Sequence, residues 1–131
     1  MIKRLLVNPC LVALFYFSCC ALSAFEIEGH YSASGFDPYF KNSYTGTALI
    51  IEDDNDVYQF RWDYDQGGKL YESMGTGIRV GDFISIVFRD LPSENASEEG
   101  VQIYKITDDS LEGPFVLADK NLIGTEKLTK K

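Results

Sequence analysis

The sequence predicts an all-β domain, namely a small antiparallel eight-stranded up-and-down barrel. Three observations predict it. Apolar and polar residues alternate with a period of two in several runs, as in strands with one buried and one solvated face. Short segments rich in Gly, Asn and Asp separate these runs, as in hairpin turns. We find no ten-residue window with the apolar stripe of an amphipathic helix.

The first 24 residues predict a secretory signal peptide. Lys3 and Arg4 precede an apolar run over 5–17, and three small residues follow between 21 and 24. Positive charges, then an apolar stretch, then small residues at the cleavage site are typical of a cleaved export signal. We therefore expect residues 1–24 to be a signal peptide and residues 25–131 to form a single β-barrel domain, periplasmic or extracellular.

Two alternatives to a cleaved signal stay open. An uncleaved membrane anchor would need about 20 apolar residues, and this run is shorter and is interrupted by Asn8 and Pro9. Lipoprotein anchoring at Cys19 or Cys20 is the second alternative, although the preceding Tyr-Phe-Ser matches a lipoprotein signal poorly. The mature chain itself is expected to contain no membrane span.

Composition excludes several classes of function. The chain has 20 acidic and 12 basic residues, a formal charge of −8, with 45% hydrophobic and 14% aromatic residues. Cleavage would remove two basic residues and all three cysteines, which leaves about −10 and no thiol. An acidic chain is not expected to bind nucleic acid through counterion release, and a chain without cysteine holds no zinc–thiolate or iron–sulfur site.

Eight strands are expected in order along the chain. The clearest is 57–65, in which Tyr58, Phe60, Trp62 and Tyr64 share one face and polar residues the other. The turn signals are 53–56, 66–68, 80–82, 108–110 and 118–121, and two longer connections span 35–43 and 91–99. The expected strands are roughly 26–34, 44–52, 57–65, 69–77, 83–90, 100–107, 111–117 and 122–128.

Closure into a barrel is favoured over a β-sandwich. Most connections are tight turns, which suit a meander, and closing the meander removes its two exposed edges. A Greek-key β-sandwich is the alternative, but it needs long crossovers, and only two candidates exist. An eight-stranded barrel is filled by its own side chains or holds one small ligand.

A Gly-Thr pattern recurs at Gly46, at Gly75 and Gly77, and at Gly124. A phosphate-binding loop is one interpretation, but none of these glycines opens a helix and no P-loop lysine follows. Glycine inside a strand allows sharp coiling and close approach of neighbouring backbones. We expect that structural role.

Short glycine-based motifs cover nearly all of the mature chain. They are Gly29-His-Tyr31, Tyr44-Thr-Gly46, Val57-Tyr58 with Trp62, Gly75-Thr-Gly77, Gly100-Val-Gln-Ile-Tyr104, Leu111-Glu-Gly113 and Gly124-Thr-Glu126-Lys-Leu128. In this order they resemble a family of small exported bacterial proteins, often labelled "fibronectin-binding protein" or uncharacterised. The resemblance implies a lipocalin- or avidin-like barrel exported to the periplasm or beyond, and implies little about activity.

The chain departs from this family at one position. Members usually carry Trp two residues after the glycine of Leu-x-Gly, where this chain has Phe115 preceded by Pro114. Phe115 can fill the same apolar volume. Pro114 gives up a ladder hydrogen bond, which predicts a sheet edge or a bulge.

The sequence does not predict an enzyme. His30 is the only histidine and no Gly-x-Ser-x-Gly motif is present, so we expect His30 at the surface or at a barrel end. Acidic pairs occur at 53–56, 63/65, 98/99 and 108/109, but most fall in turns or on solvated faces. A glycosidase needs two carboxyls about 5–10 Å apart across a cleft. We expect no catalytic residue and no cofactor.

The acidic turn 53–56 has two interpretations. Four oxygen-bearing side chains could bind calcium, but the EF-hand spacing, its glycine and its terminal glutamate are missing. A solvated turn is the expectation, and no metal site is predicted.

The aromatic row gives the candidate ligand-binding residues Tyr58, Phe60, Trp62, Tyr64 and, from another strand, Tyr104. These rings either line the barrel mouth around a small apolar guest or fill the core. Core is favoured, because a barrel this small has to be filled. Tyr31 and Tyr71 are further candidates for the interior.

The expected function is that of an exported, non-enzymatic binding or structural β-barrel module. One alternative is an acidic barrel that binds a basic or host protein, as a lysozyme inhibitor or adhesin would, since a charge near −10 steers basic partners. The other is a lipocalin-type carrier of a small apolar molecule. An open, aromatic-lined cavity favours the carrier, and a plugged barrel with one acidic surface favours the protein partner.

Overall fold

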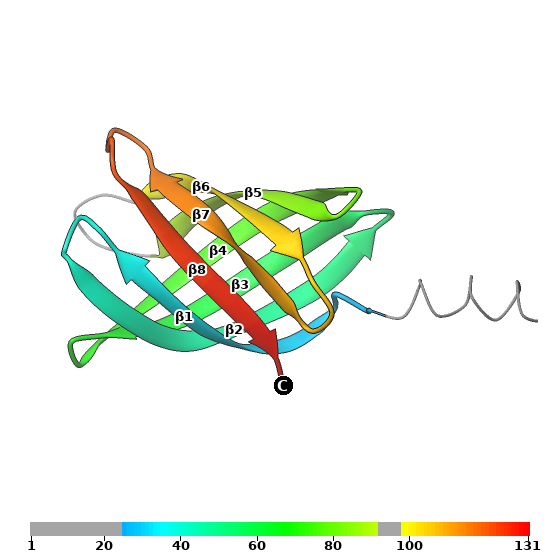
Figure 1. Cartoon of the computed structure of the whole chain (residues 1–131), viewed down its shortest axis with the longest axis horizontal. Coiled ribbons are helices and arrows are strands. Elements are labelled where there is room, and N and C mark those ends of the chain that lie inside the picture. The colour runs from blue at the N-terminus through cyan, green and yellow to red at the C-terminus, as the bar shows by residue number, and fades with distance from the viewer. Residues whose placement is uncertain (1–24, 92–97) are drawn as a thin grey trace, which may run out of the picture.

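The computed structural model describes residues 25–91 and 98–131, and these form one closed antiparallel barrel (Figure 1). Each strand pairs with its neighbours in sequence, and the first pairs with the last, so the sheet closes. The predicted up-and-down barrel is confirmed, and the sandwich alternative is wrong. The strands are β1 Gly29–Asp37, β2 Asn42–Asp54, β3 Val57–Gln66, β4 Lys69–Val80, β5 Phe83–Leu91, β6 Glu99–Ile106, β7 Ser110–Leu117 and β8 Ile123–Lys130.

Two predicted features lie wholly or partly outside the described residues. The signal peptide over 1–24 is one, and most of the connection 91–99 is the other. Within the described ranges no helix is long and apolar enough to cross a membrane.

The period-two pattern sets which side chains fill the barrel. In β3, Tyr58, Phe60 and Trp62 point inward and are 4%, 2% and 2% exposed. The same parity in β8 turns Glu126 and Leu128 inward, with 3% and 0% exposed. Apolar burial of this kind supplies the main stabilising free energy of a domain without disulfides.

The first strand and the connection after it differ from expectation. β1 runs three residues later than predicted, and only 38–41 separate it from β2. The Asp37 carboxylate accepts a hydrogen bond from the backbone N–H of Tyr39 at 2.8 Å, and Lys41 has a φ of 56°. An Asx turn of this kind closes a tight hairpin, so the expected long loop over 35–43 is wrong.

Pro114 produces neither an edge nor a bulge. β7 pairs on both sides, and Pro114 itself pairs with Thr125 of β8. Towards β6 the ladder is interrupted between the pairs Gln102–Phe115 and Lys105–Glu112, with no shift in register. The Gln102 side chain fills the interruption, because its Nε2 lies 3.1 Å from the carbonyl oxygens of Gly113 and Pro114.

The strand glycines make room for close packing, as expected. A Cβ on Gly46 would lie 2.1 Å from the Asp63 carbonyl oxygen, and one on Gly77 would lie 2.6 Å from the Ile86 side chain. Any larger residue would push the neighbouring strand or side chain away. These positions therefore fix the tight curvature of the wall.

One end of the barrel is closed by apolar side chains. Ile27, just before β1, is 2% exposed, and its carbonyl oxygen accepts a hydrogen bond from the Tyr31 hydroxyl at 2.5 Å. Phe25 packs against the same cluster. Residues 25–28 thus cover the end where the β2–β3, β4–β5 and β6–β7 turns lie, on the right in Figure 1. The core of this half includes Tyr31, Ile50, Tyr58, Ile84, Leu111 and Leu128.

Candidate ligand-binding cavity

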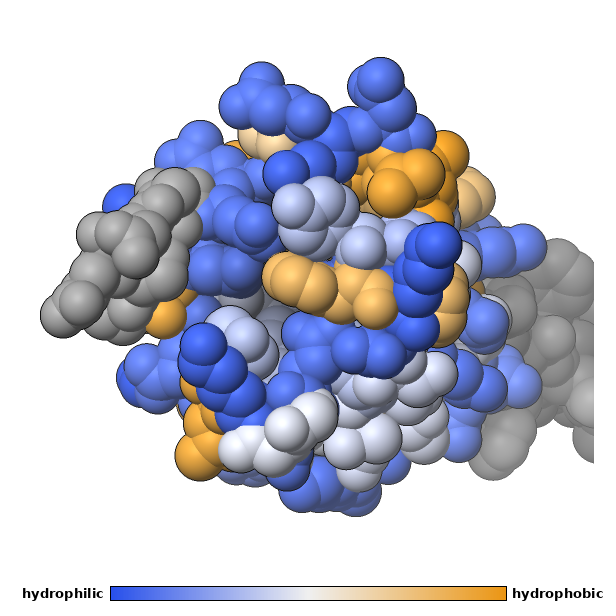
Figure 2. Space-filling model, turned by 90° about the vertical axis from the view of Figure 1, so that its left-hand side faces the viewer, coloured by the Kyte–Doolittle hydropathy of each residue, from blue (hydrophilic) through white to orange (hydrophobic). Residues whose placement is uncertain are grey.

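The opposite end of the barrel opens into a cavity of about 580 Å³. It lies between the β1–β2, β3–β4 and β7–β8 turns and the ends of β5 and β6, on the left in Figure 1. Figure 2 looks onto this end and shows a mostly hydrophilic rim with a few apolar groups. The lining residues on which the site depends are Tyr44, Trp62, Tyr64, Phe88, Asp90, Gln102, Tyr104, Phe115 and Glu126.

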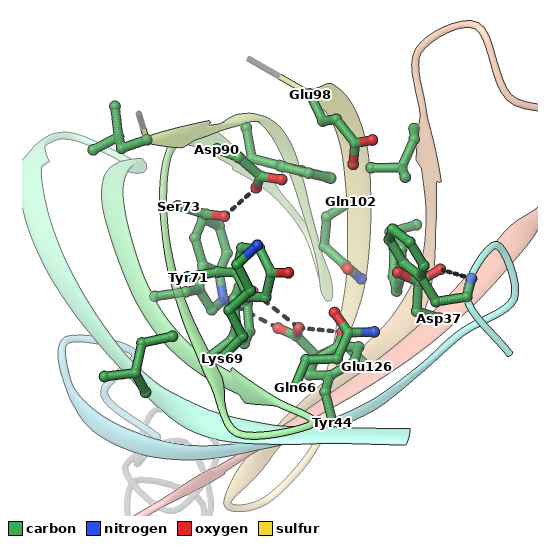
Figure 3. Close-up of a pocket in the computed structure, with 18 of the residues that line it drawn as sticks. Asp37, Tyr44, Gln66, Lys69, Tyr71, Ser73, Asp90, Glu98, Gln102 and Glu126 are labelled. Carbon is green, nitrogen blue, oxygen red and sulfur yellow. Dashed lines mark hydrogen bonds between the residues drawn. The ribbon is translucent and has the colours of Figure 1, made fainter. Parts of the chain in front are cut away.

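Glu126 of β8 is a buried carboxylate at the floor of this cavity (Figure 3). Its Oε1 accepts hydrogen bonds from Trp62 Nε1 at 3.0 Å and from the Tyr104 hydroxyl at 2.5 Å. Its Oε2 accepts from the hydroxyls of Tyr44 at 2.7 Å and Tyr64 at 3.1 Å. Four donors from β2, β3 and β6 therefore converge on one side chain of β8. The two oxygens of an ionised carboxylate offer about four acceptor sites, so the donors match them.

Burial dominates the titration of these groups. Burial raises the pKa of Glu126, and the hydrogen bonds from Tyr104, Tyr44, Tyr64 and Trp62 oppose that rise. Burial, followed by the negative charge of Glu126, raises the pKa of Tyr44, Tyr64 and Tyr104. The three phenols therefore keep their protons throughout the neutral range.

This network fixes how the tyrosines face a ligand. Each hydroxyl has one proton, and with Glu126 ionised the hydroxyl donates that proton in a hydrogen bond to the carboxylate. Tyr104 is fully buried, so the partly exposed Tyr44 and Tyr64 are the phenols that present oxygens to the cavity, and these oxygens have only lone pairs left. The floor is thus a set of hydrogen-bond acceptors that a buried negative charge polarises.

Aromatic rings in edge-to-face contact form the wall of the cavity. Phe88 lies 6.2 Å from Trp62 and 6.4 Å from Phe115, centroid to centroid. Tyr44 continues the series, at 6.5 Å from Phe115 and 5.1 Å from Tyr64. Such pairs hold one another in place, so the wall is formed before any ligand arrives.

Carboxylates dominate the rim. Asp37, Asp90 and Glu98 line the mouth, where Lys69 is the one basic lining residue. Burial, and secondarily the charge of Asp37, raises the pKa of Asp90, which accepts a hydrogen bond from Ser73. Burial and the charge of Asp90 raise the pKa of Glu98.

Two amides complete the lining. Gln102 is 3% exposed and commits its Nε2 to backbone carbonyls, which leaves Oε1 as the atom that it offers to the cavity. Gln66 has a buried Nε2 without a hydrogen-bond partner among the described residues. A buried donor of this kind requires an acceptor from water or from a ligand.

The structure divides the candidate residues from the aromatic row. Trp62, Tyr64 and Tyr104 line the cavity. Tyr58 and Phe60 do not, since they belong to the packed core, where Phe60 stacks on Trp62 at 5.2 Å. Of the further candidates, Tyr71 lies at the cavity, while Tyr31 is fully buried near the closed end.

Sequence reasoning missed the polar half of the site. Glu126, Asp90 and Gln102 were not candidates, although each falls on the inward parity of its strand. Glu126 alternates with Gly124 and Leu128, and Asp90 with Ile86 and Phe88. A polar residue on an inward position was the available signal.

Other candidate chemistry lies away from the cavity. His30 is exposed on β1, as expected. Asp56 lies in an exposed turn with a φ of 61°. In the part of the chain that the structure describes, no three His, Cys, Asp or Glu side chains are grouped so as to hold a metal ion.

Comparisons with known proteins define the fold alone. No family model matches the chain, and no curated protein matches it. A redesigned β-barrel superimposes with a TM-score of 0.70 and 7% identity, over 80% of this chain and 91% of that one. A de novo designed fluorescence-activating β-barrel gives 0.62 and 17%, over 80% and 94%. EF1p2_mFAP2b bound to DFHBI gives 0.69 and 8%, also over 80% and 94%. The chain is therefore similar in fold to small closed β-barrels.

Proposed function

We propose that the protein is an exported, non-enzymatic binding protein that holds a small molecule in the open half of its barrel. The observation that carries the proposal is the cavity of about 580 Å³, which is open at one end and has Glu126 at its floor. Ligand pockets commonly measure about 300–1,000 Å³ and combine aromatic walls with a few placed polar groups. This combination supports the carrier among the three expected functions.

The free-energy cost of burying Glu126 and its four donors at the cavity floor also supports a binding role. A buried charge has to be desolvated, and replacing a buried polar network as a set by apolar residues is often neutral or stabilising. A barrel selected only for stability would fill position 126 and its partners with apolar side chains. Retention of a carboxylate with four donors fits a site that is kept for a ligand.

The same saturation favours binding over catalysis. A general acid or base needs a free position within hydrogen-bond reach of the substrate proton. Both Glu126 oxygens already accept two hydrogen bonds each. The network is thus suited to holding a charge in place.

The similar barrels add support at the level of the fold. One is a designed fluorescence-activating barrel, and another is bound to DFHBI. Closed barrels of this size can therefore accept a small molecule, which is what the proposal requires of this chain.

Native mass spectrometry of protein purified from its own host tests the proposal. We expect a co-purifying molecule that is lost on denaturation. Ser73→Phe, whose ring would occupy the cavity, is expected to abolish it, whereas Thr76→Phe on the outer face of the same strand leaves it bound. Protein that carries no added mass and binds none of the probes described below would overturn the proposal.

Export is the second element of the proposal, and it depends on the character of residues 1–24. Intact-mass measurement of the mature protein tests it. A mass that corresponds to a chain beginning at Ala24 or Phe25 supports cleavage. A diacylglycerol adduct on Cys19 or Cys20 would instead support lipid anchoring.

A basic protein partner is a second candidate, favoured by the carboxylates at the mouth. Asp37, Asp90 and Glu98 could receive a lysine or arginine from such a partner. Salt-sensitive binding to lysozyme or fibronectin would support this candidate. Its absence, together with a co-purifying small molecule, would leave the carrier.

A further inference from the structure

We propose that the ligand is an organic cation that donates N–H hydrogen bonds, with an ammonium or guanidinium group on an apolar body. This inference rests on the proposed function and specifies the class of molecule. Three features of the cavity lead to it: the direction of the hydroxyl protons, the sign of the charges and the nature of the walls.

The floor favours a ligand that donates hydrogen bonds. The hydroxyls of Tyr44, Tyr64 and Tyr104 all donate to Glu126. Tyr104 is fully buried, so the oxygens of the partly exposed Tyr44 and Tyr64, with Oε1 of Gln102, are left as acceptors for the cavity. A ligand that offered only acceptors would face lone pairs and lose the hydrogen bonds that it made to water.

The charges favour a cation. Four carboxylates, Asp37, Asp90, Glu98 and Glu126, line the cavity, against the single basic residue Lys69. Lys69 lies at the exposed rim, with its Nζ 5.7 Å from the centroid of the Tyr71 ring. Walls of low dielectric concentrate such a field inside a cavity, so an anion would be repelled and a cation attracted.

The walls favour an apolar body next to the charged group. Trp62, Phe88 and Phe115 provide aromatic surface between the acidic rim and the carboxylate floor. Aromatic faces attract cations in addition to burying apolar surface. Gln66 is the exception to the acceptor character, and its unpartnered Nε2 suits a hydroxyl or carbonyl oxygen on the ligand.

Three adamantane probes of matched size test the inference. They are 1-adamantylmethylammonium, 1-adamantanemethanol and 1-adamantanecarboxylate, which differ mainly in charge. Trp62 is the single tryptophan of the chain and lies in the cavity, so its fluorescence reports binding, and the probes do not absorb there. We expect the ammonium to bind at least about tenfold more tightly than the alcohol at low salt, and the carboxylate most weakly.

Neutralising the rim tests the source of the preference. The variant D37N/D90N/E98Q removes three carboxylates from the mouth while amides keep the shape and the Asx turn. It is expected to reduce the preference for the ammonium probe to below about threefold. The control D56N/D108N/D109N makes the same change in net charge in turns at the closed end, and should keep the preference within about twofold of the wild type.

The wild-type protein provides an independent test through pH. The groups that face the cavity are Asp37 of β1, Asp90 of β5, Glu98, Glu126 of β8, Lys69 and the tyrosines. Lowering the pH through the raised pKa values of Asp90, Glu98 and Glu126 should weaken binding of the ammonium and leave that of the alcohol unchanged.

The outcomes separate the two proposals. Binding of the alcohol or the carboxylate as tightly as the ammonium would overturn the inference and keep the carrier function. Equal loss of preference in the rim variant and its control would also overturn it. Failure of all three probes, with no co-purifying molecule, would overturn the proposed function itself.

Discussion

The two ends of the barrel are built from the same strands, but one end is packed with apolar side chains and the other surrounds a cavity. β8 places Leu128 in the packed half and Glu126, two residues earlier, at the cavity floor. β5 similarly places Ile84 in the packed half and Asp90 at the mouth. Backbone geometry and alternation are common to both ends, so the choice of inward residue alone separates a stabilising half from a half suited to binding.

The largest expected effect comes from removing the buried charge. Glu126→Leu leaves four donors without their acceptor, and each unsatisfied buried donor costs about 1–3 kcal/mol. We expect the free energy of unfolding to fall by about 4 kcal/mol or more in a urea titration followed by circular dichroism. Adding Tyr44→Phe, Tyr64→Phe and Tyr104→Phe should recover much of this loss, because Trp62 Nε1 is then the one donor of the network left without its acceptor. No recovery would mean that the network itself stabilises the fold.

A large-to-small change in the packed half provides the contrast. Ile84 is fully buried, and Ile84→Ala is expected to cost about 2–5 kcal/mol through lost burial and a cavity. Binding of the ammonium probe by the folded variant should be unchanged, as measured by Trp62 fluorescence. A tenfold loss of affinity would show that the two halves are coupled.

The individual hydroxyls should differ in importance. Tyr104 is fully buried, and its hydroxyl lies 2.5 Å from Glu126. Tyr104→Phe is therefore expected to cost about 1.5–3 kcal/mol, the range for hydrogen bonds to charged groups. Tyr64 is half-buried with a longer contact of 3.1 Å, so Tyr64→Phe should cost less. The reverse order in urea titrations would contradict this geometry.

The open half should also set the pH dependence of stability. Burial raises the pKa of Glu126, Asp90 and Glu98 above their ordinary values of 4.5, 3.8 and 4.5. These carboxyls therefore bind protons more tightly in the folded state than in the unfolded state. The stability that they contribute is complete at pH values below their ordinary pKa values, and it is lost as the pH rises through their raised pKa values. We expect the melting temperature to rise as pH falls from 7.5 towards 4.5.

A variant pair tests the origin of this slope. E126Q/D90N/E98Q should flatten the dependence, whereas Ile84→Ala should lower the melting temperature and keep the slope. Cation binding should weaken over the same range in which the fold gains stability. If cation binding and the melting temperature both rose as the pH fell, the pH dependence could not be assigned to these carboxyls.

The smallest effect is expected on the outer wall. Arg61 and Glu72 form an ion pair at 2.9 Å, with side chains 55% and 45% exposed. Exposed pairs contribute little, so Glu72→Gln should leave the urea midpoint unchanged within error. A clear shift would show that the outer charges matter as well.

The fold was predictable because local signals agree along the chain. Strict alternation in 57–65 and turns such as Gly67-Gly68, with φ of 63° and 81°, each specify strand and hairpin independently. The error at 35–43 arose because Asp37 closes a tight turn through its side chain, and a single Asp-Pro pair does not specify turn length. The edge or bulge predicted at Pro114 was wrong because the side chain of Gln102, on the neighbouring strand, donates hydrogen bonds to the backbone carbonyls of Gly113 and Pro114.

The site was only half predictable. The aromatic row indicated Trp62 and Tyr64, but the alternating pattern does not tell how far along the barrel axis each ring lies. Tyr58 and Phe60 were therefore included, although they pack in the core. Depth depends on strand stagger, which alternation does not encode. The convergence of Tyr44 on Glu126, 82 residues away in sequence, requires closure of β1 on β8 and is visible only in three dimensions.

Closure has a consequence for recognition by other proteins. Every strand has a hydrogen-bonded neighbour on both sides, so the described sheet presents no free backbone edge to which another chain could add a strand. A protein partner would have to recognise side chains, either at the acidic mouth or on the outer wall. Specificity for such a partner would reside in residues that can be exchanged without altering the hydrogen-bonded frame of the barrel.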